Sequence, residues 1–381
     1  MKTIFICFGT RPEAIKMAPV VRELQERDRF RVVTCLTGQH REMLDQVIQL
    51  FVLPVDHDLD IMRRTQSLTH ITSAVLEGLE PILTAESPDL VLVHGDTTTT
   101  FAAALAAFYQ EIPVAHVEAG LRTANLYNPY PEEANRRLAD RLSAAHYAPT
   151  PAARDALLSE GLGPESILVT GNTVIDALLE TSKSSPPEWS PEIDDAWDRP
   201  GTKILVTVHR RESQGAPMES IARAIARVCR EYPQCTFIFP IHLNPVVRET
   251  FRSALGKEPS VVFTEPLPYL DFVHLMKRVD LVITDSGGVQ EEAPTLGKPV
   301  LVMRDTTERP EGMEAGTARL VGTDADNIAE ALRVLITDAS AYARMAQAVN
   351  PYGDGRAAQR IADDLEQRLG LRKTPALPFD P

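Results

Sequence analysis

The sequence has few cysteines and fewer basic than acidic residues, and each shortage excludes a class of protein. The four cysteines lack C-x-x-C spacing and no H-E-x-x-H pattern occurs, so no metal site is indicated. We expect these cysteines to be buried thiols: Cys7, Cys35, Cys229 and Cys235. Lysine and arginine total 39 against 53 acids in 381 residues, a formal net charge of −14. Because nucleic-acid affinity depends on cations that neutralise phosphates, we expect no nucleic-acid partner.

Long apolar runs are also missing. The N-terminal stretch 4–8 has five apolar residues before Gly9, fewer than the roughly 7 to 15 of a signal-peptide core. No other run approaches the roughly 20 apolar residues that cross a bilayer as a helix. The sequence therefore predicts a cytoplasmic protein without a membrane partner.

Short apolar runs alternate with helical patterns along the chain, which is typical of βαβ units. Several runs lack polar alternation, as expected of parallel strands that are covered by helices on both faces. The predicted strands are 3–8, 31–36, 90–93, 114–117, 204–208, 236–239, 261–263, 281–284 and 300–303. These patterns predict an α/β protein built on parallel sheets.

Segment 181–201 is rich in Ser, Pro and acidic residues and lacks sustained periodicity, so it is predicted to be irregular or linking. Strand and helix patterns lie on both sides of it. We predict two doubly wound domains, residues 1–171 and 172–355, with the boundary near Gly171. Apolar residues four apart predict a final amphipathic helix within 355–369.

The first predicted helix begins directly after the first strand. Thr10 and Glu13 have the spacing of a capping box, and Pro12 lies in the first turn. Arg11 and Lys16 flank this turn, where cations would favour an anionic ligand. The alternative for both cations is an ordinary surface position.

Two carboxylates follow predicted strands directly. Ligands of open parallel sheets bind beyond the carboxyl ends of the strands, so residues at these positions are candidates for chemistry. Strand 90–93 runs into His94 and Asp96, and strand 114–117 runs into Glu118. If these strands are neighbours, both carboxylates project from one edge of the sheet. The alternative for each residue singly is a solvated loop position.

Two further segments carry candidate groups. Strand 204–208 delivers His209 in the same way. A predicted helix start supplies a third carboxylate, Glu132 or Glu133, with Arg136 on the same helix face as Glu132 at i, i+4. We count Arg136 among the candidate substrate-binding residues. The alternative for the acids is ordinary compensation of the helix dipole.

Segment 285–292, DSGGVQEE, follows a predicted strand and reads as a glycine turn that opens a helix. Glycines let a phosphate approach backbone N–H groups, and a helix start adds positive potential. Arg304 and Arg309 follow the next strand and support an anionic ligand. A second interpretation is a nucleophile elbow with Ser286 as nucleophile, although Thr284 replaces its first glycine.

No cofactor is indicated by the motifs. The phosphate-binding G-K-[ST] pattern is missing, and the loose G-x-G-x-x-A match at 353–358 follows helical sequence instead of a strand. We therefore expect a site that works without a metal or a nicotinamide.

Taken together, the motifs resemble one family, the non-hydrolysing UDP-N-acetylglucosamine (UDP-GlcNAc) 2-epimerases, over about residues 3–370. The segments that carry the resemblance are GTRPEAIKMAPV (9–20), TGQHREMLDQV (37–47), HGDTTTT (94–100), HVEAGLRT (116–123), PYPEEANRRLAD (129–140), GNTVIDAL (171–178), VTVHRRES (206–213) and TDSGGVQEEAPTLGKPVLVMRDTTERPE (284–311).

The resemblance implies a GT-B-like fold, with two Rossmann-like domains facing a central cleft and a C-terminal helix, 356–370, packing back on the first domain. It implies an isomerase that interconverts UDP-GlcNAc and UDP-N-acetylmannosamine (UDP-ManNAc). Members are typically homodimers that supply UDP-ManNAc for cell-surface polysaccharides or teichoic-acid linkage units.

The resemblance also implies roles for individual residues. Asp96, Glu118 and Glu132 match the acid/base carboxylates, and His209 matches the cleft histidine. The residues matched to UDP binding are Arg11, Lys16, Phe272 (beside the uracil), Ser286, Gly287, Gly288, Glu292 and Arg309. Several members are activated by a second UDP-GlcNAc, through residues matching Gln39, His40, Gln66, Arg210 and His242.

This chain departs from the family pattern at a few positions. Leu267 stands where many relatives have Gln, which questions a side-chain contact to the uracil. Glu42 and Thr65 differ from the polar or basic residues of some regulated relatives, which bears on activation.

The chemistry implied is elimination of UDP to 2-acetamidoglucal, followed by re-addition. We expect cations and a glycine turn on one domain and carboxylates on the other. The rival functions are a GT-B glycosyltransferase, a hydrolysing epimerase, a non-catalytic nucleotide-sugar sensor and a serine hydrolase acting through Ser286.

Overall fold

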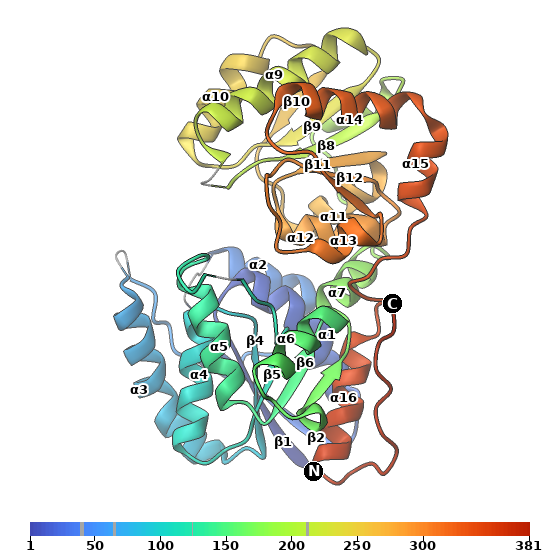
Figure 1. Ribbon diagram of the computed structural model, residues 1–381. Coiled ribbons are helices and arrows are strands. Elements are labelled where there is room, and N and C mark those ends of the chain that lie inside the picture. Colours follow the sequence, from blue (N-terminus) through green and yellow to red (C-terminus); the bar gives the residue numbers. More distant parts are fainter. Residues whose placement is uncertain (39–41, 64–65, 124, 211–212) are drawn as a thin grey trace. The chain divides into compact units, whose positions relative to one another are not determined.

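The computed structural model describes residues 1–38, 42–63, 66–123, 125–210 and 213–381. The chain forms two compact units, one made of Met1–Ala177 with Tyr352–Pro381 and one of Leu178–Pro351. Figure 1 labels most of the helices and strands of both units. Each unit is built on a parallel β-sheet, which confirms the predicted α/β class with two parallel-sheet domains.

The first unit contains a seven-stranded sheet in the order β3-β2-β1-β4-β5-β6-β7. Its strands are β1 (Lys2–Phe8), β2 (Phe30–Leu36), β3 (His57–Asp58), β4 (Leu90–His94), β5 (Val114–Val117), β6 (Ala145–Ala148) and β7 (Ile167–Val169). Its helices are α1 (Arg11–Gln25), α2 (Glu42–Phe51), α3 (Leu68–Glu86), α4 (Thr98–Tyr109), α5 (Glu132–Leu142), α6 (Pro151–Ser159) and α16 (Ala357–Arg368), and α7 (Thr173–Thr181) leads into the second unit. The strand order reverses beside β1, the position where doubly wound sheets bind ligands.

Alternating strand residues pack this sheet against its helices. Phe5 and Cys7 of β1 lie in one apolar cluster with Val75 and Leu79 of α3 and with the alanines of α4. The small alanines let α4 approach the sheet closely, and burying each large side chain contributes about 1.5–3 kcal/mol. All four cysteines are buried and free, as predicted.

The start of α1 differs from the predicted capping box. Thr10 is the N-cap residue, but its side chain makes no capping hydrogen bond. The Glu13 carboxylate instead accepts hydrogen bonds from the Gly9 N–H (3.1 Å) and from the Thr97 hydroxyl (2.7 Å). Burial raises the pKa of Glu13, although these donors oppose the shift. Glu13 therefore ties α1 to the loop after β4 instead of capping its own helix.

The C-terminal helix α16 belongs to the first unit and packs on α1, as the red and blue ribbons of Figure 1 show. The Asp176 carboxylate accepts hydrogen bonds from the N–H groups of Ala357 (3.2 Å) and Ala358 (2.9 Å) at its start. Arg27, which lies just after α1, forms an ion pair with Asp363 of α16 at 2.8 Å. These contacts fix the helix on the first sheet.

The second unit contains a six-stranded sheet in the order β10-β9-β8-β11-β12-β13. Its strands are β8 (Lys203–Thr207), β9 (Thr236–Pro240), β10 (Val261–Thr264), β11 (Leu281–Thr284), β12 (Val300–Val302) and β13 (Ala318–Leu320). Its helices are α8 (Pro191–Asp198), α9 (Ala216–Glu231), α10 (Pro245–Leu255), α11 (Tyr269–Arg278), α12 (Gly287–Thr295), α13 (Pro310–Glu314), α14 (Ala325–Thr337) and α15 (Ala339–Ala346). Here the order reverses beside β8, as it does beside β1.

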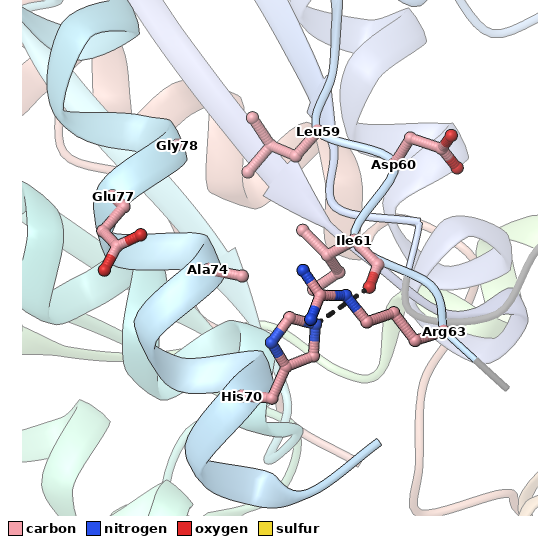
Figure 2. A pocket seen from close by; sticks show the side chains of 8 residues that line it. All are labelled: Leu59, Asp60, Ile61, Arg63, His70, Ala74, Glu77 and Gly78. Carbon is pink, nitrogen blue, oxygen red and sulfur yellow. Dashed lines mark hydrogen bonds between the residues drawn. The ribbon is translucent and has the colours of Figure 1, made fainter. Parts of the chain in front are cut away.

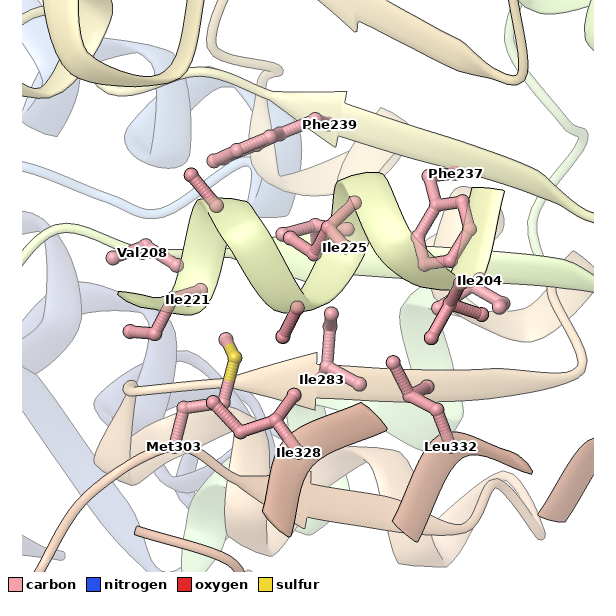
Figure 3. Close-up of a cluster of buried hydrophobic side chains, with 14 of the residues drawn as sticks. Ile204, Val208, Ile221, Ile225, Phe237, Phe239, Ile283, Met303, Ile328 and Leu332 are labelled. Carbon is pink, nitrogen blue, oxygen red and sulfur yellow. The ribbon is translucent and has the colours of Figure 1, made fainter. Parts of the chain in front are cut away.

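Both faces of the second sheet are covered by helices. Ile204 packs with Ile225 of α9 and Leu332 of α14, as Figure 3 shows. Leu205, the next residue along β8, points to the opposite face and lies in a cluster with Val273 of α11. This alternation between two apolar faces explains why the predicted strands lack polar positions.

All nine predicted strands are present, but four short strands were missed: β3, β6, β7 and β13. β3, β6 and β13 contain polar residues and have no continuous apolar run, and the run of β7 has only three residues. The prediction of irregular chain at 181–201 is wrong in part, because α8 forms there and buries Ile193 and Ala196. Among the helices of the described ranges, none combines the length and the apolar character that crossing a bilayer requires.

Candidate active site

The carboxyl ends of β4 and β5 bring two predicted carboxylates to one edge of the first sheet. The two strands pair in parallel, which confirms that they are neighbours. Asp96 follows β4, and Glu118 follows β5. Glu118 has a φ of +65°, a conformation uncommon for a residue other than glycine. Such positions cost free energy and cluster at active sites, so Glu118 is a strong candidate for a functional group.

Polar contacts hold Glu118 firmly. Its Oε1 atom accepts hydrogen bonds from Lys16 Nζ and, at 2.8 Å, from Asn172 Nδ2. Its Oε2 atom lies 3.5 Å from Nε2 of His94. The side chain is only 9% exposed, so these neighbours fix where the carboxylate points.

The Lys16 contact corrects the expected division of charge. We expected cations and carboxylates on different domains, but Lys16 and Glu118 form an ion pair within the first unit. The carboxylate edge therefore carries its own cation. Arg11 begins α1 beside the same edge.

Asp96 is more exposed, at 31% of its side chain. Arg136 of α5 donates a hydrogen bond to its carboxylate at 2.6 Å, and Asn135 donates to its backbone carbonyl at 2.9 Å. Helix α5 thus positions the loop after β4, and Asp96 remains accessible to a ligand.

The two acids at the start of α5 have different environments. Glu133 is buried and accepts hydrogen bonds from the Thr123 N–H (3.0 Å) and from Arg137 (2.7 Å), and it pairs with Arg136 at 3.2 Å. Glu132 has a buried Oε2 atom with no hydrogen-bond partner in the described ranges. Glu133 is therefore a structural residue, and Glu132 is the acid of the pair whose carboxylate can take a proton or a ligand.

His209 follows β8 in the second unit and is held by a buried acid that the sequence analysis left without a role. Asp285 accepts hydrogen bonds from the backbone N–H groups of His209 (3.0 Å) and Arg210 (2.9 Å), and its carboxylate lies 3.1 Å from His209 Nδ1. Burial alone would raise the pKa of Asp285, but the contacts with His209 lower it overall. An ionised Asp285 favours a proton on Nδ1, which presents Nε2 outward on a side chain that is 42% exposed.

The glycine turn opens α12, as predicted. Ser286 is the N-cap residue with φ −77° and ψ 135°, which is ordinary extended backbone. A nucleophile elbow needs a strained turn, so this geometry argues against Ser286 as a nucleophile. The Arg309 side chain lies in the space that a side chain at position 287 would need. An added Cβ atom at Gly287 would lie 3.1 Å from the guanidinium carbon of Arg309. Glycine here lets an arginine lie against the helix start.

Three arginines converge on one carboxylate beside this turn. Glu308 contacts Arg304 (2.7 Å), Arg210 (2.8 Å) and Arg309 (3.1 Å). Burial opposes ionisation of Glu308, but the three guanidinium groups lower its pKa to about 2. Arg309 also donates to Glu291 at 2.6 Å. The cluster is a cationic site whose charge an internal anion compensates.

Three other predicted residues lie in the second unit. Glu292 of α12 accepts a hydrogen bond from the Tyr269 hydroxyl at 3.1 Å. Phe272 and Leu267 are partly buried against the apolar cluster under α11.

Among the predicted activator residues, His242 stacks on His209 with ring centroids 5.9 Å apart. Arg210, another of them, directly follows His209 in the chain. Gln66 precedes the start of α3. Gln39 and His40 lie outside the described residues, as does Thr65.

A cavity of about 380 Å³ lies elsewhere in the first unit, between α3 and the segment after β3. Figure 2 shows Arg63 and His70 in its wall, with His70 Nε2 3.4 Å from the carbonyl oxygen of Ile61. None of the predicted carboxylates lines it. Within the part of the chain that the structure describes, no group of three or more His, Cys, Asp or Glu side chains is arranged to hold a metal ion.

The fold and these sheet edges define a GT-B-like α/β protein, and solved structures of that class align with nearly the whole chain. The S. aureus MnaA–UDP structure is 46% identical and covers 100% of both chains, with a TM-score of 0.90. The UDP-GlcNAc 2-epimerase from Neisseria meningitidis, solved bound to UDP-GlcNAc, is 49% identical over 96% of this chain and 100% of that chain, with a TM-score of 0.86.

Sequence comparison gives the particular family. The family described as UDP-N-acetylglucosamine 2-epimerase matches residues 22–366. The UDP-N-acetylglucosamine 2-epimerase of Yersinia pestis is 52% identical over 371 residues, which are 96% of this chain and 98% of that protein. The chain belongs to the UDP-N-acetylglucosamine 2-epimerase family, and the predicted resemblance to these enzymes is confirmed.

Proposed function

We propose that this chain interconverts UDP-GlcNAc and UDP-ManNAc at C2 without hydrolysis, through 2-acetamidoglucal. The C2 proton is not adjacent to a carbonyl group, so a carboxylate of ordinary basicity cannot remove it directly. Departure of UDP from C1 changes this, because oxocarbenium character at C1 acidifies the C2–H bond. The C1–O bond must therefore break ahead of the C2–H bond.

The leaving diphosphate needs positive charge and hydrogen-bond donors. The second unit supplies these groups in the glycine turn at the start of α12 and in Arg309, which lies against it. His209 would donate a proton to the diphosphate or stabilise its charge through Nε2, with Nδ1 directed to Asp285. UDP binding through Arg11, Lys16, Arg136, Phe272, Ser286, Gly288 and Glu292 is part of this proposal.

Proton transfer at C2 requires groups that can reach both faces of that carbon. The proposal assigns this work to two of Asp96, Glu118 and Glu132, and the third orients the sugar or tunes their basicity. The observation that carries the proposal is the gathering of Asp96 and Glu118 on adjacent strand ends, with an unpartnered Glu132 oxygen at the start of α5 within the described ranges. Re-addition of UDP after protonation on the opposite face gives the manno epimer.

The cellular setting is proposed on the same basis. We infer a cytoplasmic homodimer that uses no cofactor and supplies UDP-ManNAc for cell-surface polysaccharide synthesis. Activation by a second UDP-GlcNAc molecule through Gln39, His40, Gln66, Arg210 and His242 is also proposed. The adjacency of Arg210, His242 and His209 in the second unit supports this regulation.

NMR of UDP-GlcNAc incubated with pure enzyme in D2O tests the proposal. We expect a mixture of UDP-GlcNAc and UDP-ManNAc that carries deuterium at C2. Free N-acetylmannosamine would indicate a hydrolysing epimerase, and unchanged UDP-GlcNAc would indicate a transferase or a sensor. Reaction of Ser286 with a fluorophosphonate probe would indicate a serine hydrolase. Product without solvent deuterium would overturn the mechanism.

A further inference from the structure

His94 is a buried polar side chain that the proposed chemistry does not yet use. It is the last residue of β4 and is 3% exposed. Both ring nitrogens are buried, and neither has a hydrogen-bond partner in the described ranges. Burying an imidazole without partners costs free energy, because the ring loses its hydrogen bonds to water. Such groups are rare in native proteins, so this one calls for an explanation.

A carboxylate oxygen of Glu118 lies beside the ring. His94 Nε2 lies 3.5 Å from Glu118 Oε2, the oxygen opposite the one that binds Lys16 and Asn172. The other charged or titratable groups acting on the ring are Lys16 and His116. Burial lowers the pKa of His94 to about 3, despite the attraction of Glu118. The ring is therefore neutral at physiological pH and carries one nitrogen lone pair.

We propose that His94 is a positioning residue for Glu118, and that its Nε2 atom accepts a hydrogen bond from Glu118 when that carboxyl group carries the C2 proton. In this step the C2–H bond breaks and its proton moves to Glu118 Oε2. The electron pair of the C2–H bond becomes the second bond between C1 and C2, and UDP keeps the pair of the C1–O bond. The inference rests on the proposed function and deepens it, because it assigns Glu118 as one of the two proton carriers.

The proposal explains why His94 and Glu118 form no hydrogen bond while Glu118 is ionised. The proposal places the ring proton on Nδ1, so that the Nε2 lone pair faces the negative Oε2 atom and repels it; the two atoms lie 3.5 Å apart without a hydrogen bond. Protonation of Oε2 replaces this repulsion with an O–H···N hydrogen bond. His94 then stabilises the state that follows proton transfer and not the ground state, which is the condition for accelerating a reaction.

Three substitutions test whether His94 acts as a hydrogen-bond acceptor for Glu118 or only packs against its neighbours. His94→Leu removes both nitrogens, His94→Gln keeps an acceptor at the reach of Nε2, and His94→Asn keeps one only at the reach of Nδ1. We expect His94→Leu and His94→Asn to lower kcat by roughly tenfold or more, with KM for UDP-GlcNAc unchanged within about twofold. His94→Gln should recover most of kcat. The thermal midpoint of His94→Leu should not fall, because no hydrogen bond is lost.

The result that would overturn the inference is wild-type kcat in His94→Leu, or equal kcat values in His94→Gln and His94→Asn. If His94→Leu fails to fold, the comparison of the Gln and Asn variants decides alone. The wild-type enzyme is assayed first in D2O. A wild type that does not exchange C2–H refutes the proposed function, whereas normal exchange in wild type and in His94→Leu refutes only the role of His94.

Discussion

The two units share one architecture and place opposite charges at its functional edge. In the first unit, carboxylates gather after β4 and β5, and Lys16 and Arg136 pair with them. In the second, arginines gather beside the start of α12, and Glu308 and Glu291 pair with them. Asp96 and Glu118 thus each have a cationic partner, whereas in the second unit three guanidinium groups contact the single carboxylate of Glu308. The comparison teaches that the loops after the strands of one fold can gather carboxylates or guanidinium groups.

The largest effect on activity should come from replacing the first of the two acids at the start of α5. Glu132→Gln should lower kcat by roughly 10² to 10⁴ and leave the thermal midpoint unchanged, because its Oε2 atom has no hydrogen-bond partner in the described ranges to lose. Glu133→Gln is the matched control. It should lower the unfolding free energy by about 3 kcal/mol, because it removes the buried carboxylate that pairs with Arg136 and accepts a hydrogen bond from the Thr123 N–H group. The opposite pattern would show that the wrong acid has been assigned to catalysis.

A second test removes the internal anion of the second unit. Glu308 has a pKa of about 2 in the folded chain against an ordinary value of 4.5. Its ionisation therefore stabilises the fold above pH 4.5, on the order of 2 to 3 kcal/mol, and this is lost as pH falls from 4.5 towards 2. The stability difference between wild type and Glu308→Gln should be largest at neutral pH and shrink in that window. UDP, which supplies negative charge, should raise the thermal midpoint of Glu308→Gln more than that of wild type. A difference independent of pH would contradict the ion-pair account.

The stability of the first unit should depend on pH in a higher range than the contribution of Glu308 does. His94 has a pKa of about 3 in the folded chain, and the ordinary value is 6.5. The unfolded chain therefore binds this proton first, and the wild type loses stability as pH falls through 6.5 towards 3. Denaturant unfolding should show a loss of roughly 2 kcal/mol between pH 6.5 and 5 that His94→Leu lacks. If the unfolding free energies of the two proteins change with pH in parallel, burial does not lower the pKa of His94 in the folded chain.

The smallest expected effect concerns the two adjacent glycines of the turn. A Cβ atom at Gly287 would lie 3.1 Å from the Arg309 guanidinium carbon, whereas at Gly288 the nearest atom, Glu292 Oε2, would be 3.7 Å away. Gly287→Ala should displace Arg309 and weaken UDP binding by roughly tenfold, the effect of about 1.4 kcal/mol. Gly288→Ala should weaken UDP binding less than Gly287→Ala, because its Cβ atom displaces no arginine. Calorimetric titration with UDP measures both, and equal weakening would remove the role given to Gly287.

Much of this organisation could be predicted from the sequence. Continuous apolar runs located β1, β4, β5, β8 and β11, and the structure brings the polar residues that follow β4 and β5 to one edge of the first sheet. Short strands such as β6, with the sequence AHYA, carry no such signal. Helix α8 was missed because it buries only Ile193 and Ala196 in a proline-rich segment.

The finer contacts depend on residues far apart in the sequence. Lys16 and Glu118 are separated by 102 positions, and Arg210 and Glu308 by 98, so no local pattern announces either pair. The residues alone left Glu132 and Glu133 open, the family resemblance matched Glu132, and only the structure shows the different partners of the two carboxylates. Asp285 had one available signal, an acid directly after a fully buried strand, and that signal was noted without a role.

Positional isotope exchange tests most directly the order of bond breaking on which the account depends. UDP-GlcNAc labelled with ¹⁸O in the bridge between C1 and the β-phosphorus is incubated with the enzyme in D2O. The account predicts that the label moves into non-bridging positions of the β-phosphate at least as fast as deuterium enters C2. Deuterium at C2 with the label still entirely in the bridge would contradict it.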